Sequence, residues 1–262
     1  MDAYDIIIQG GQSNAEGFGI GAVKQAYIPS DEIVYLNVEK TEVAVDDRIQ
    51  VTYLDKPFRI EKARERLRAD GQLLGDFSLT FAKRYVENGF LEKGRKILVV
   101  RAAIGGTGFQ KGHWGIRAPL YKKMLEMTDY ALSLNSANKA VAFLWHQGEH
   151  DAVEGNLGEN YYKQLLGTVT SVRKRYGDIP FIAGDFVHEW KNKNLEICVP
   201  IVNAIKKISE TIGNAALVET ADLLSNNQKT GNGDDIHFCR ESLYLLGEHY
   251  FEQYKNLQNK TV

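Results

Sequence analysis

The sequence has 262 residues, of which 44% are hydrophobic and 25% are charged, so its composition is that of an ordinary globular protein. Its 32 Lys and Arg residues nearly balance its 34 Asp and Glu residues, which gives a formal net charge of −2. Because no cationic surplus is available to neutralise a row of phosphates, nucleic acid is excluded as an expected partner.

Short apolar segments rich in β-branched residues alternate along the chain with longer segments of helical period. The predicted strands are Tyr4–Gln9, Ile33–Asn37, Lys96–Arg101, Lys139–Trp145, Pro180–Ala183 and Ala215–Glu219. The predicted helices are Leu73–Asn88, Pro119–Leu134, Asn160–Tyr176, Cys198–Ile212 and Ser242–Tyr254. Several strands carry apolar residues at both alternating sets of positions, as expected for central parallel strands that are covered on two faces.

This alternation predicts an α/β fold with three layers, α/β/α, around a central and mostly parallel sheet. The length suits one well-buried domain, and we expect residues 1–262 to form it. The segment Glu42–Ile60 departs from the pattern, because its run VAVDDRIQVTYL alternates between apolar and polar residues. It predicts a β-hairpin inserted into the domain near residues 42–60.

The N-terminal run MDAYDIIIQGG begins with an acid, and its apolar part is far shorter than the roughly 7–15 residues of a signal peptide. No segment approaches the roughly 18 uninterrupted apolar residues of a membrane span, so no membrane partner is expected. The two cysteines, Cys198 and Cys239, are too few for a disulfide framework. We therefore expect a cytoplasmic protein with reduced cysteines.

A first candidate site follows the first predicted strand, in the run GGQSNAEG at residues 10–17. Ligands of open α/β sheets bind beyond the carboxyl ends of the strands, so Ser13 is expected there, beside backbone N–H groups that favour developing negative charge. The alternative is an ordinary Gly-Ser turn in which Ser13 is a helix N-cap. The run only approaches the nucleophile elbow GxSxG, because its fifth position is Ala15.

A second candidate site lies near the C-terminus, in the run GDDIHF at residues 233–238. A serine hydroxyl needs a base to accept its proton, and that base needs a third group to orient its ring. Asp234 stands three residues before His237, so one turn of chain can bring its carboxylate to Nδ1 and leave Nε2 free for Ser13. Asp235 competes for the orienting role, and a solvated histidine in a surface loop is the alternative to the whole arrangement.

Two further runs also follow predicted strands: AAIGGTG at residues 102–108 and WHQGEHD at residues 145–151. A bare backbone N–H in a Gly-rich turn can approach an oxyanion, and the amide of Gln147 is a donor of the kind that an oxyanion hole uses. The second run also fits the zinc pattern HxxEH through His146 and His150. That pattern needs both histidines on one face of a helix, but Gly148 interrupts the run and a strand leads directly into it. We therefore expect no metal.

Taken together, these runs resemble those of the SGNH-hydrolase superfamily, which has a flavodoxin-like architecture, and within it the carbohydrate acetylesterases. That branch includes the sialate O-acetylesterase and acetylxylan esterase relatives of carbohydrate esterase family six. The matching blocks are GQSNAEG at residues 11–17, Gly105-Gly106-Thr107 with Trp114, the WxQGExD run at 145–151, and DxxH at 234–237. They stand in the family's order and span nearly the whole chain.

The resemblance implies a serine esterase that removes O-acetyl groups from a small carbohydrate without any cofactor. Its nucleophile would be Ser13, its general base His237, and the orienting acid Asp234, with Glu149 as the alternative acid. The implied oxyanion donors are the N–H groups of Ser13 and Gly106 and the side chain of Gln147. The candidate substrate contacts are Gln12, Asn14, Trp114 and Glu149.

Two departures from the family pattern concern the pocket. Ala15 replaces the methionine that usually follows GQSN, and Gly108-Phe109-Gln110 replaces a serine followed by an aliphatic residue. A lipase or thioesterase on the same scaffold, and a catalytically silent binder of acylated sugars, remain the alternatives.

Overall fold

The computed structural model describes residues 2–45, 48–54 and 57–260. Within them, seven strands form one central sheet in the order β11-β10-β9-β1-β8-β2-β5. These strands are β1 (Ala3–Gly11), β2 (Ile33–Asn37), β5 (Arg59–Lys62), β8 (Arg95–Arg101), β9 (Lys139–His146), β10 (Phe181–Gly184) and β11 (Ala215–Val218). Neighbouring strands are parallel except for β2 and β5, which are antiparallel.

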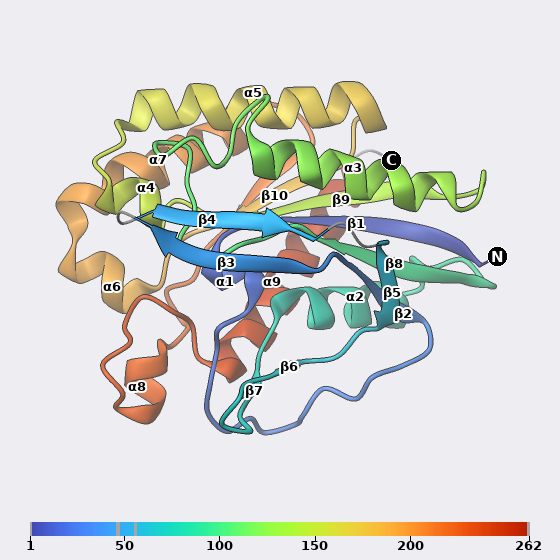
Figure 1. Ribbon diagram of the computed structural model, residues 1–262, viewed down its shortest axis with the longest axis horizontal. Coiled ribbons are helices and arrows are strands. Elements are labelled where there is room, and N and C mark those ends of the chain that lie inside the picture. Colours follow the sequence, from blue (N-terminus) through green and yellow to red (C-terminus); the bar gives the residue numbers. More distant parts are fainter. Residues whose placement is uncertain (1, 46–47, 55–56, 261–262) are drawn as a thin grey trace.

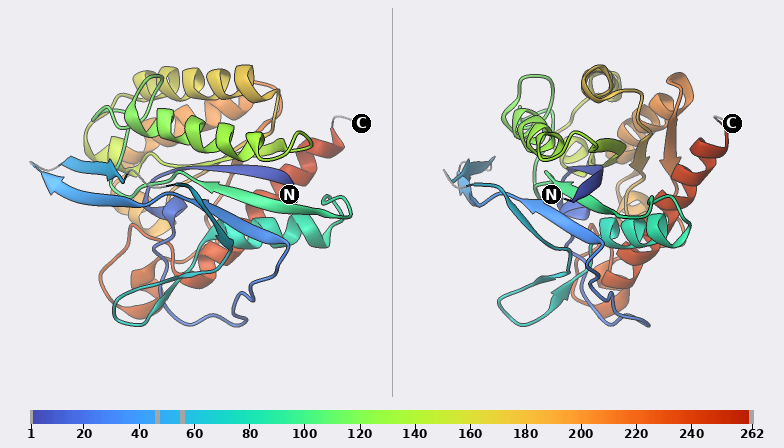
Figure 2. Two further views of the ribbon diagram at one scale, coloured as in Figure 1. Left: turned by 45° about the vertical axis from the view of Figure 1, so that its right-hand side comes forward. Right: turned by 90° about the vertical axis from the view of Figure 1, so that its right-hand side faces the viewer.

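Helices cover both faces of this sheet. The longer ones are α2 (Phe77–Glu87), α3 (Pro119–Ser133), α5 (Gly158–Tyr176), α7 (Leu195–Thr211) and α9 (Arg240–Asn259). The short ones are α1 (Ser13–Glu16), α4 (Glu149–Val153), α6 (His188–Lys193) and α8 (Asn226–Thr230). Figures 1 and 2 show α3, α5 and α7 on one face and α2 and α9 on the other. The predicted α/β/α layering is confirmed.

The order of the strands in the middle of the sheet determines where a ligand is expected. Strand β1 lies between β8 and β9, and its residues Ile6, Ile7 and Ile8 are fully buried because helices pack on both sides. After β1 the chain adds β2 and β8 on one side before it crosses to β9 on the other. The crevice at the carboxyl ends of β1 and β9 is therefore the point where the winding direction reverses, which is the usual ligand position of such sheets.

The predicted start of the helix at residues 73–88 is wrong. Helix α2 begins at Phe77 rather than at Leu73, because Asp76 is its N-cap and accepts a hydrogen bond from the N–H of Ser78 at 2.9 Å. Leu73–Leu74 instead forms β7, which pairs with β6 (Arg66–Leu67) in a two-stranded sheet. The apolar spacing of this segment continued the helical period beyond the residue that caps the helix.

The predicted hairpin is present as β3 (Lys40–Val45) and β4 (Arg48–Tyr53), which pair in antiparallel register. Residues 46–47 lie outside the described residues. The range 42–60 extends too far toward the C-terminus, since β5 begins at Arg59 and belongs to the central sheet. The hairpin strands are therefore Lys40–Val45 and Arg48–Tyr53.

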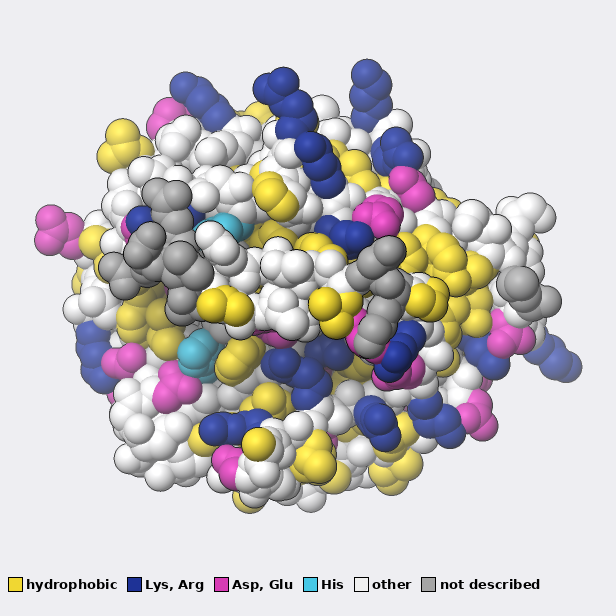
Figure 3. All heavy atoms as spheres, viewed as in Figure 1, with side chains coloured by type: hydrophobic (Ala, Val, Ile, Leu, Met, Phe, Trp, Pro, Cys, Tyr) yellow, Lys and Arg dark blue, Asp and Glu magenta, His cyan; other side chains and the backbone are white. Residues whose placement is uncertain are grey.

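On the face drawn in Figure 3, acidic and basic side chains are interspersed, in keeping with the small net charge. Cys198 and Cys239 are free and buried. None of the helices among the described residues combines the length and apolar character that crossing a membrane requires.

Candidate active site

Ser13 stands where β1 ends and α1 begins, directly above the switch point of the sheet. The N–H of Gln12 donates to the carbonyl of His146 at 3.0 Å, which joins the ends of β1 and β9. Gly11 permits this contact, since its φ is +134° and a Cβ there would lie 2.2 Å from the oxygen of His146. The glycine before the serine is thus required by the close approach of two backbones.

His237 and Asp234 form a hydrogen-bonded pair in the loop between α8 and α9. The Nδ1 atom of His237 lies 2.9 Å from Oδ1 and 3.0 Å from Oδ2 of Asp234. Partial burial favours a higher pKa for Asp234, but hydrogen bonds from His237 and from Asn226 outweigh it and hold the pKa below its ordinary value. The carboxylate is therefore ionised at neutral pH. The competing Asp235 points elsewhere and pairs with Lys193 at 2.9 Å.

The histidine loop is attached to the helix that carries the serine. Asn14 donates to the carbonyl of Ile236 at 3.1 Å and accepts from the N–H of Phe238, also at 3.1 Å. The ring of Phe18 stacks on the imidazole of His237, with 5.4 Å between the ring centroids. Asn14 is 1% exposed, so the structure gives it a role in holding the loop rather than in contacting a substrate.

Ser13 and His237 line the same open pocket of about 360 Å³, which we call the Ser13 pocket. Its described walls are Gln12, Ser13, Phe18, Glu42, Gly105, Gly106, Glu149, His150, Val153, Ile236 and His237. They come from the N-cap of α1, α1 and the segment after it, the hairpin, the loop after β8, α4 and the histidine loop. The serine and the histidine that the sequence separates by more than 200 residues are therefore brought to one cavity.

Two residues that line this pocket have backbone N–H groups available as donors. Ser13 begins α1, so its N–H has no acceptor within the helix, and Gly106 lines the pocket with a φ of 66°. Neither N–H has a hydrogen-bond acceptor among the residues that the structure describes. Both can therefore donate to a negatively charged oxygen.

The structure does not bring the third expected donor, Gln147, to the pocket. Its side chain is fully buried beneath the wall, and Nε2 donates to Asp151 at 2.6 Å and to Thr107 at 3.2 Å. It also lies 3.2 Å from Oε1 of Gln12. The hydrogen bond to the carboxylate of Asp151 keeps the amide of Gln147 in the interior, and for this reason Gln147 is not a donor in the Ser13 pocket.

Gln12, rather than Gln147, is the glutamine that lines the Ser13 pocket. Its Oε1 atom accepts from Nε2 of Gln147 and from the N–H groups of Gly148 and His150, at 3.2, 3.4 and 3.1 Å. Three donors on one oxygen fix the orientation of the amide. The Nε2 group of Gln12 has no partner among the described residues and is left as a donor at the wall of the Ser13 pocket.

The two acids of the WxQGExD run have separate roles. Glu149 accepts from Nδ2 of Asn14 at 2.8 Å, and burial raises the pKa of Glu149. Asp151 accepts from the N–H groups of Phe109 and Gln110 at 2.9 and 2.8 Å. Glu149 thus supports the residue that holds the histidine loop, whereas Asp151 anchors the Gly-rich loop after β8.

The structure does not support the role expected of Trp114 in contacting a sugar or a zinc site at His146 and His150. Trp114 is 2% exposed, donates to Thr107 at 3.0 Å and packs edge-on against Trp145, so it is unavailable for stacking on a sugar. His146 ends β9, where burial lowers its pKa to about 3 and Nδ1 contacts Tyr250 at 3.0 Å, whereas His150 belongs to α4. The described residues contain no group of three or more side chains suited to a metal ion.

Sequence reasoning missed Phe18, Glu42 and Val153, all of which line the Ser13 pocket. Phe18 follows the serine motif by one residue, so its position was a usable signal. Glu42 lies in the hairpin. The alternating pattern of that segment predicts a hairpin but does not show that one of its side chains lines a pocket formed by distant loops. The contribution of Glu42 depends on the packing of β3 beside the loops of the central sheet.

The chain matches the family model for sialic acid-specific acetylesterases, which are carbohydrate esterases, over residues 3–256. The chain belongs to this family. As a member of it, the protein is a carboxylic ester hydrolase that removes acetyl groups from carbohydrates, and a small acetylated carbohydrate is its substrate. No curated protein matches the sequence significantly.

Solved structures share the fold of this acetylesterase. NanS is 18% identical with a TM-score of 0.75, over 99% of this chain and 98% of that one. The Arabidopsis thaliana protein AT4G34215 is also 18% identical, with a TM-score of 0.71 over 98% and 99% of the two chains. The carbohydrate acetylesterase XAC1771 from Xanthomonas citri is 16% identical with a TM-score of 0.65, and the match covers 98% of this chain and 57% of that one. At these identities the likeness establishes the SGNH-like fold.

Proposed function

We propose that Ser13, His237 and Asp234 form the catalytic triad of this acetylesterase. The observation that carries the proposal is the shared Ser13 pocket, which brings a serine hydroxyl and a carboxylate-bound imidazole together from opposite ends of the chain. Because Asp234 occupies Nδ1, the Nε2 atom of His237 is the nitrogen that remains for the serine.

The reaction then follows in two acyl-transfer steps. Ser13 Oγ attacks the acetyl carbonyl while His237 takes the hydroxyl proton, and the C–O bond to the sugar breaks as His237 returns that proton to the leaving oxygen. A water molecule next attacks the acetyl carbonyl of the acetyl-serine while the same imidazole takes a proton from it, and the bond from the acetyl carbon to Oγ then breaks as the imidazole delivers that proton to Oγ. Acetate and the free sugar hydroxyl are the products.

Three donors are available for the tetrahedral oxyanion in this proposal: the N–H groups of Ser13 and Gly106 and the Nε2 group of Gln12. Gln12 replaces the buried Gln147 in this role, because its amide is oriented at the pocket wall. Each well-aimed donor contributes about 3–4 kcal/mol to lowering the barrier. Phe18, Val153 and Ile236 supply apolar walls beside the reacting centre.

The test compares acyl chains and sugars. The purified protein is given p-nitrophenyl acetate, butyrate and octanoate, and acetate release is followed on acetylated sialic acids, xylo-oligosaccharides and hexoses. Rapid turnover of acetyl esters alone, with release from at least one sugar, is expected. Preference for octanoate would support a lipase, and absence of turnover would support a silent binder.

Ser13→Ala provides the control for contaminating esterases. Activity is expected to fall to background, since no other group then forms the acyl intermediate. The melting temperature is expected to stay within about 2 °C of the wild type, because the change removes one hydroxyl at a pocket wall. Retention of activity by the variant would show that Ser13 is not the nucleophile.

A further inference from the structure

Glu16 connects the serine helix to the glycine turn on the other side of the Ser13 pocket. It lies three residues after Ser13 in α1 and is 8% exposed. Its Oε2 atom accepts the N–H of Gly105 at 2.7 Å. Gly105 immediately precedes Gly106, whose own N–H is a proposed oxyanion donor. One side chain therefore joins the nucleophile's helix to the residue before that donor.

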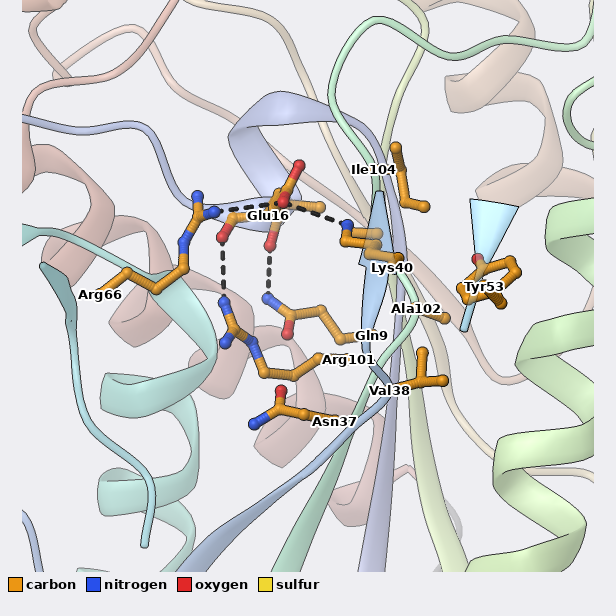
Figure 4. A pocket seen from close by; sticks show the side chains of 12 residues that line it. Gln9, Glu16, Asn37, Val38, Lys40, Tyr53, Arg66, Arg101, Ala102 and Ile104 are labelled. Atoms are coloured by element: carbon orange, nitrogen blue, oxygen red, sulfur yellow. Dashed lines mark hydrogen bonds and ion pairs between the residues drawn. The ribbon is translucent and has the colours of Figure 1, made fainter. Parts of the chain in front are cut away.

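The carboxylate of Glu16 is itself fixed by cations from two strands. Arg66 of β6 and Lys40 of β3 contact its Oε1 atom at 3.1 and 3.3 Å. Arg101 of β8 donates to the backbone carbonyl of Glu16 at 3.2 Å. Figure 4 shows these side chains converging on Glu16 from both sides. Burial works to raise the pKa of Glu16, but Lys40 and Arg66 more than offset it and keep the group ionised.

Packing alone does not hold this carboxylate in place. A cavity of about 120 Å³ adjoins it, lined in part by Gln9, Arg66 and Arg101 (Figure 4). Ile104 and Thr107 are buried at the two ends of the turn, but Gly105 and Gly106 between them have no side chains with which to pack, and Gly106 has a φ of 66°. The charged hydrogen bond from the N–H of Gly105 to Glu16 joins this middle part of the turn to α1.

We propose that Glu16 is a positioning residue that holds the oxyanion turn, residues 104–107, at the correct distance from Ser13. The inference rests on the proposed triad and oxyanion donors. Glu16 does not touch the acetyl group, and its effect passes through the N–H of Gly105 to that of Gly106. Small displacements of such a donor reduce stabilisation of the transition state more than they reduce substrate binding.

Lys40 extends the same arrangement to the hairpin. Its Nζ atom lies 2.6 Å from Glu42 as well as 3.3 Å from Glu16, and Glu42 lines the Ser13 pocket. One ammonium group of the hairpin therefore contacts both Glu42, which lines the pocket, and the carboxylate of Glu16. Lys40→Met is expected to reproduce part of the effect of removing Glu16, because Arg66 remains on the carboxylate.

The experiment measures kcat and KM for p-nitrophenyl acetate and the rate at which a fluorophosphonate probe labels Ser13, in Glu16→Gln and Glu16→Ala. The phosphoryl oxygen of the probe takes the oxyanion position, so labelling reports on the donors independently of sugar binding. We expect kcat and the labelling rate to fall about 3–10-fold in Glu16→Gln and about 10–100-fold in Glu16→Ala, with KM within about twofold. The amide of glutamine keeps one acceptor oxygen, which explains the partial rescue.

Glu65→Gln is the matched control. Glu65 is also 8% exposed and binds Arg240 through both oxygens at 2.7 and 2.6 Å, away from the Ser13 pocket. It should lower the melting temperature without changing kcat or labelling. If the Glu16 variants lose only thermal stability and retain wild-type kcat and labelling, the proposal is overturned. Should Glu16→Ala not fold, Glu16→Gln decides by the same criteria, whereas a wild type that neither turns over acetyl esters nor labels at Ser13 would refute the proposed function instead.

Discussion

The imidazole of His237 is oriented by three different contacts. Asp234 binds Nδ1, the ring of Phe18 covers one face, and Asn14 holds the backbone on either side through Ile236 and Phe238. In the proposed mechanism, a base held this way needs no reorganisation when the serine proton moves. Asp234, the acid in contact with Nδ1, is therefore expected to contribute most to the orientation and charge of the imidazole.

Asp234→Asn should therefore slow kcat by about 10²–10⁴-fold, because an amide cannot stabilise the imidazolium and favours the wrong tautomer. Glu149→Gln should have a much smaller effect, since Glu149 keeps its contact with Asn14 as an amide oxygen. Steady-state kinetics on p-nitrophenyl acetate compares the two. The reverse order of severity would assign the triad acid to Glu149.

A substitution at Gln12 tests whether its Nε2 group is the third donor of the proposed oxyanion hole. Gln12→Glu keeps the oxygen that accepts from Gly148 and His150 but replaces the Nε2 donor with a second acceptor. We expect kcat to fall about 10²–10³-fold with a modest change in melting temperature. Gln147→Leu should instead mainly reduce stability, as it removes one of the buried hydrogen bonds of Asp151. Equal loss of kcat in both, measured at temperatures where each is folded, would contradict the distinct roles.

Among the elements, α2 depends on one buried carboxylate. Asp76 caps the helix through Ser78, accepts from Gln9 at 3.0 Å and from Tyr35 at 2.9 Å, and lies 3.4 Å from Arg101. These partners come from β1, β2 and β8, so the cap also joins α2 to the central sheet.

Asp76→Ala is expected to lower the free energy of unfolding by about 3–5 kcal/mol, because it leaves the buried guanidinium of Arg101 without its carboxylate partner. Urea denaturation measures the loss. Asp70→Ala removes a similar local bond, to the N–H of Gln72 at 3.0 Å, at an exposed site. It should change stability by no more than about 0.5 kcal/mol, and a comparable loss in both variants would refute the role given to Asp76.

The same segment shows what a sequence reveals at this scale. The predicted strand Ile33–Asn37 matches β2 because its contiguous apolar residues are buried on both faces, with Ile33 and Tyr35 on one side and Leu36 on the other. The apolar spacing predicts a start at Leu73, but helix α2 begins at Phe77 because the side chain of Asp76 caps its first turn. The side-chain direction of Gln147 was equally beyond prediction, because it depends on which acceptor, Asp151 or an oxyanion, lies nearer after folding.

At the scale of the whole molecule, the site is assembled from loops that meet only because the sheet is wound in two directions. The blocks at residues 11–17, 105–107, 145–151 and 234–237 lie far apart in sequence but follow β1, β8, β9 and α8 toward one end of the sheet. The order of the motifs was sufficient to predict that they meet. The cost of this assembly is a fully buried carboxyl group, Glu149, beside the pocket.

That buried group predicts how the stability of the protein depends on pH. Burial raises the pKa of Glu149 above its ordinary value of 4.5, and its Oε2 atom has no hydrogen-bond partner within the part of the chain that the structure describes. Above pH 4.5 the unfolded chain releases this proton while the folded chain retains it, so ionisation favours the unfolded state. The contribution of Glu149 is thus least unfavourable at low pH and becomes more unfavourable as pH rises toward the folded pKa, by at most about 1.4 kcal/mol per pH unit.

Glu149→Gln removes this ionisation while keeping the oxygen that accepts from Asn14. The free energy of unfolding, measured by urea denaturation between pH 4 and 8, should therefore increase relative to the wild type as the pH rises. Glu252→Gln is the control. It removes a carboxylate whose side chain is 58% exposed, so the difference from wild type should not grow with pH. A difference between Glu149→Gln and wild type that stays constant across this pH range would mean that Glu149 ionises in the folded protein as readily as in the unfolded chain. The charge beside the Ser13 pocket would then be negative at neutral pH, and Glu149 would again be a candidate for the triad acid.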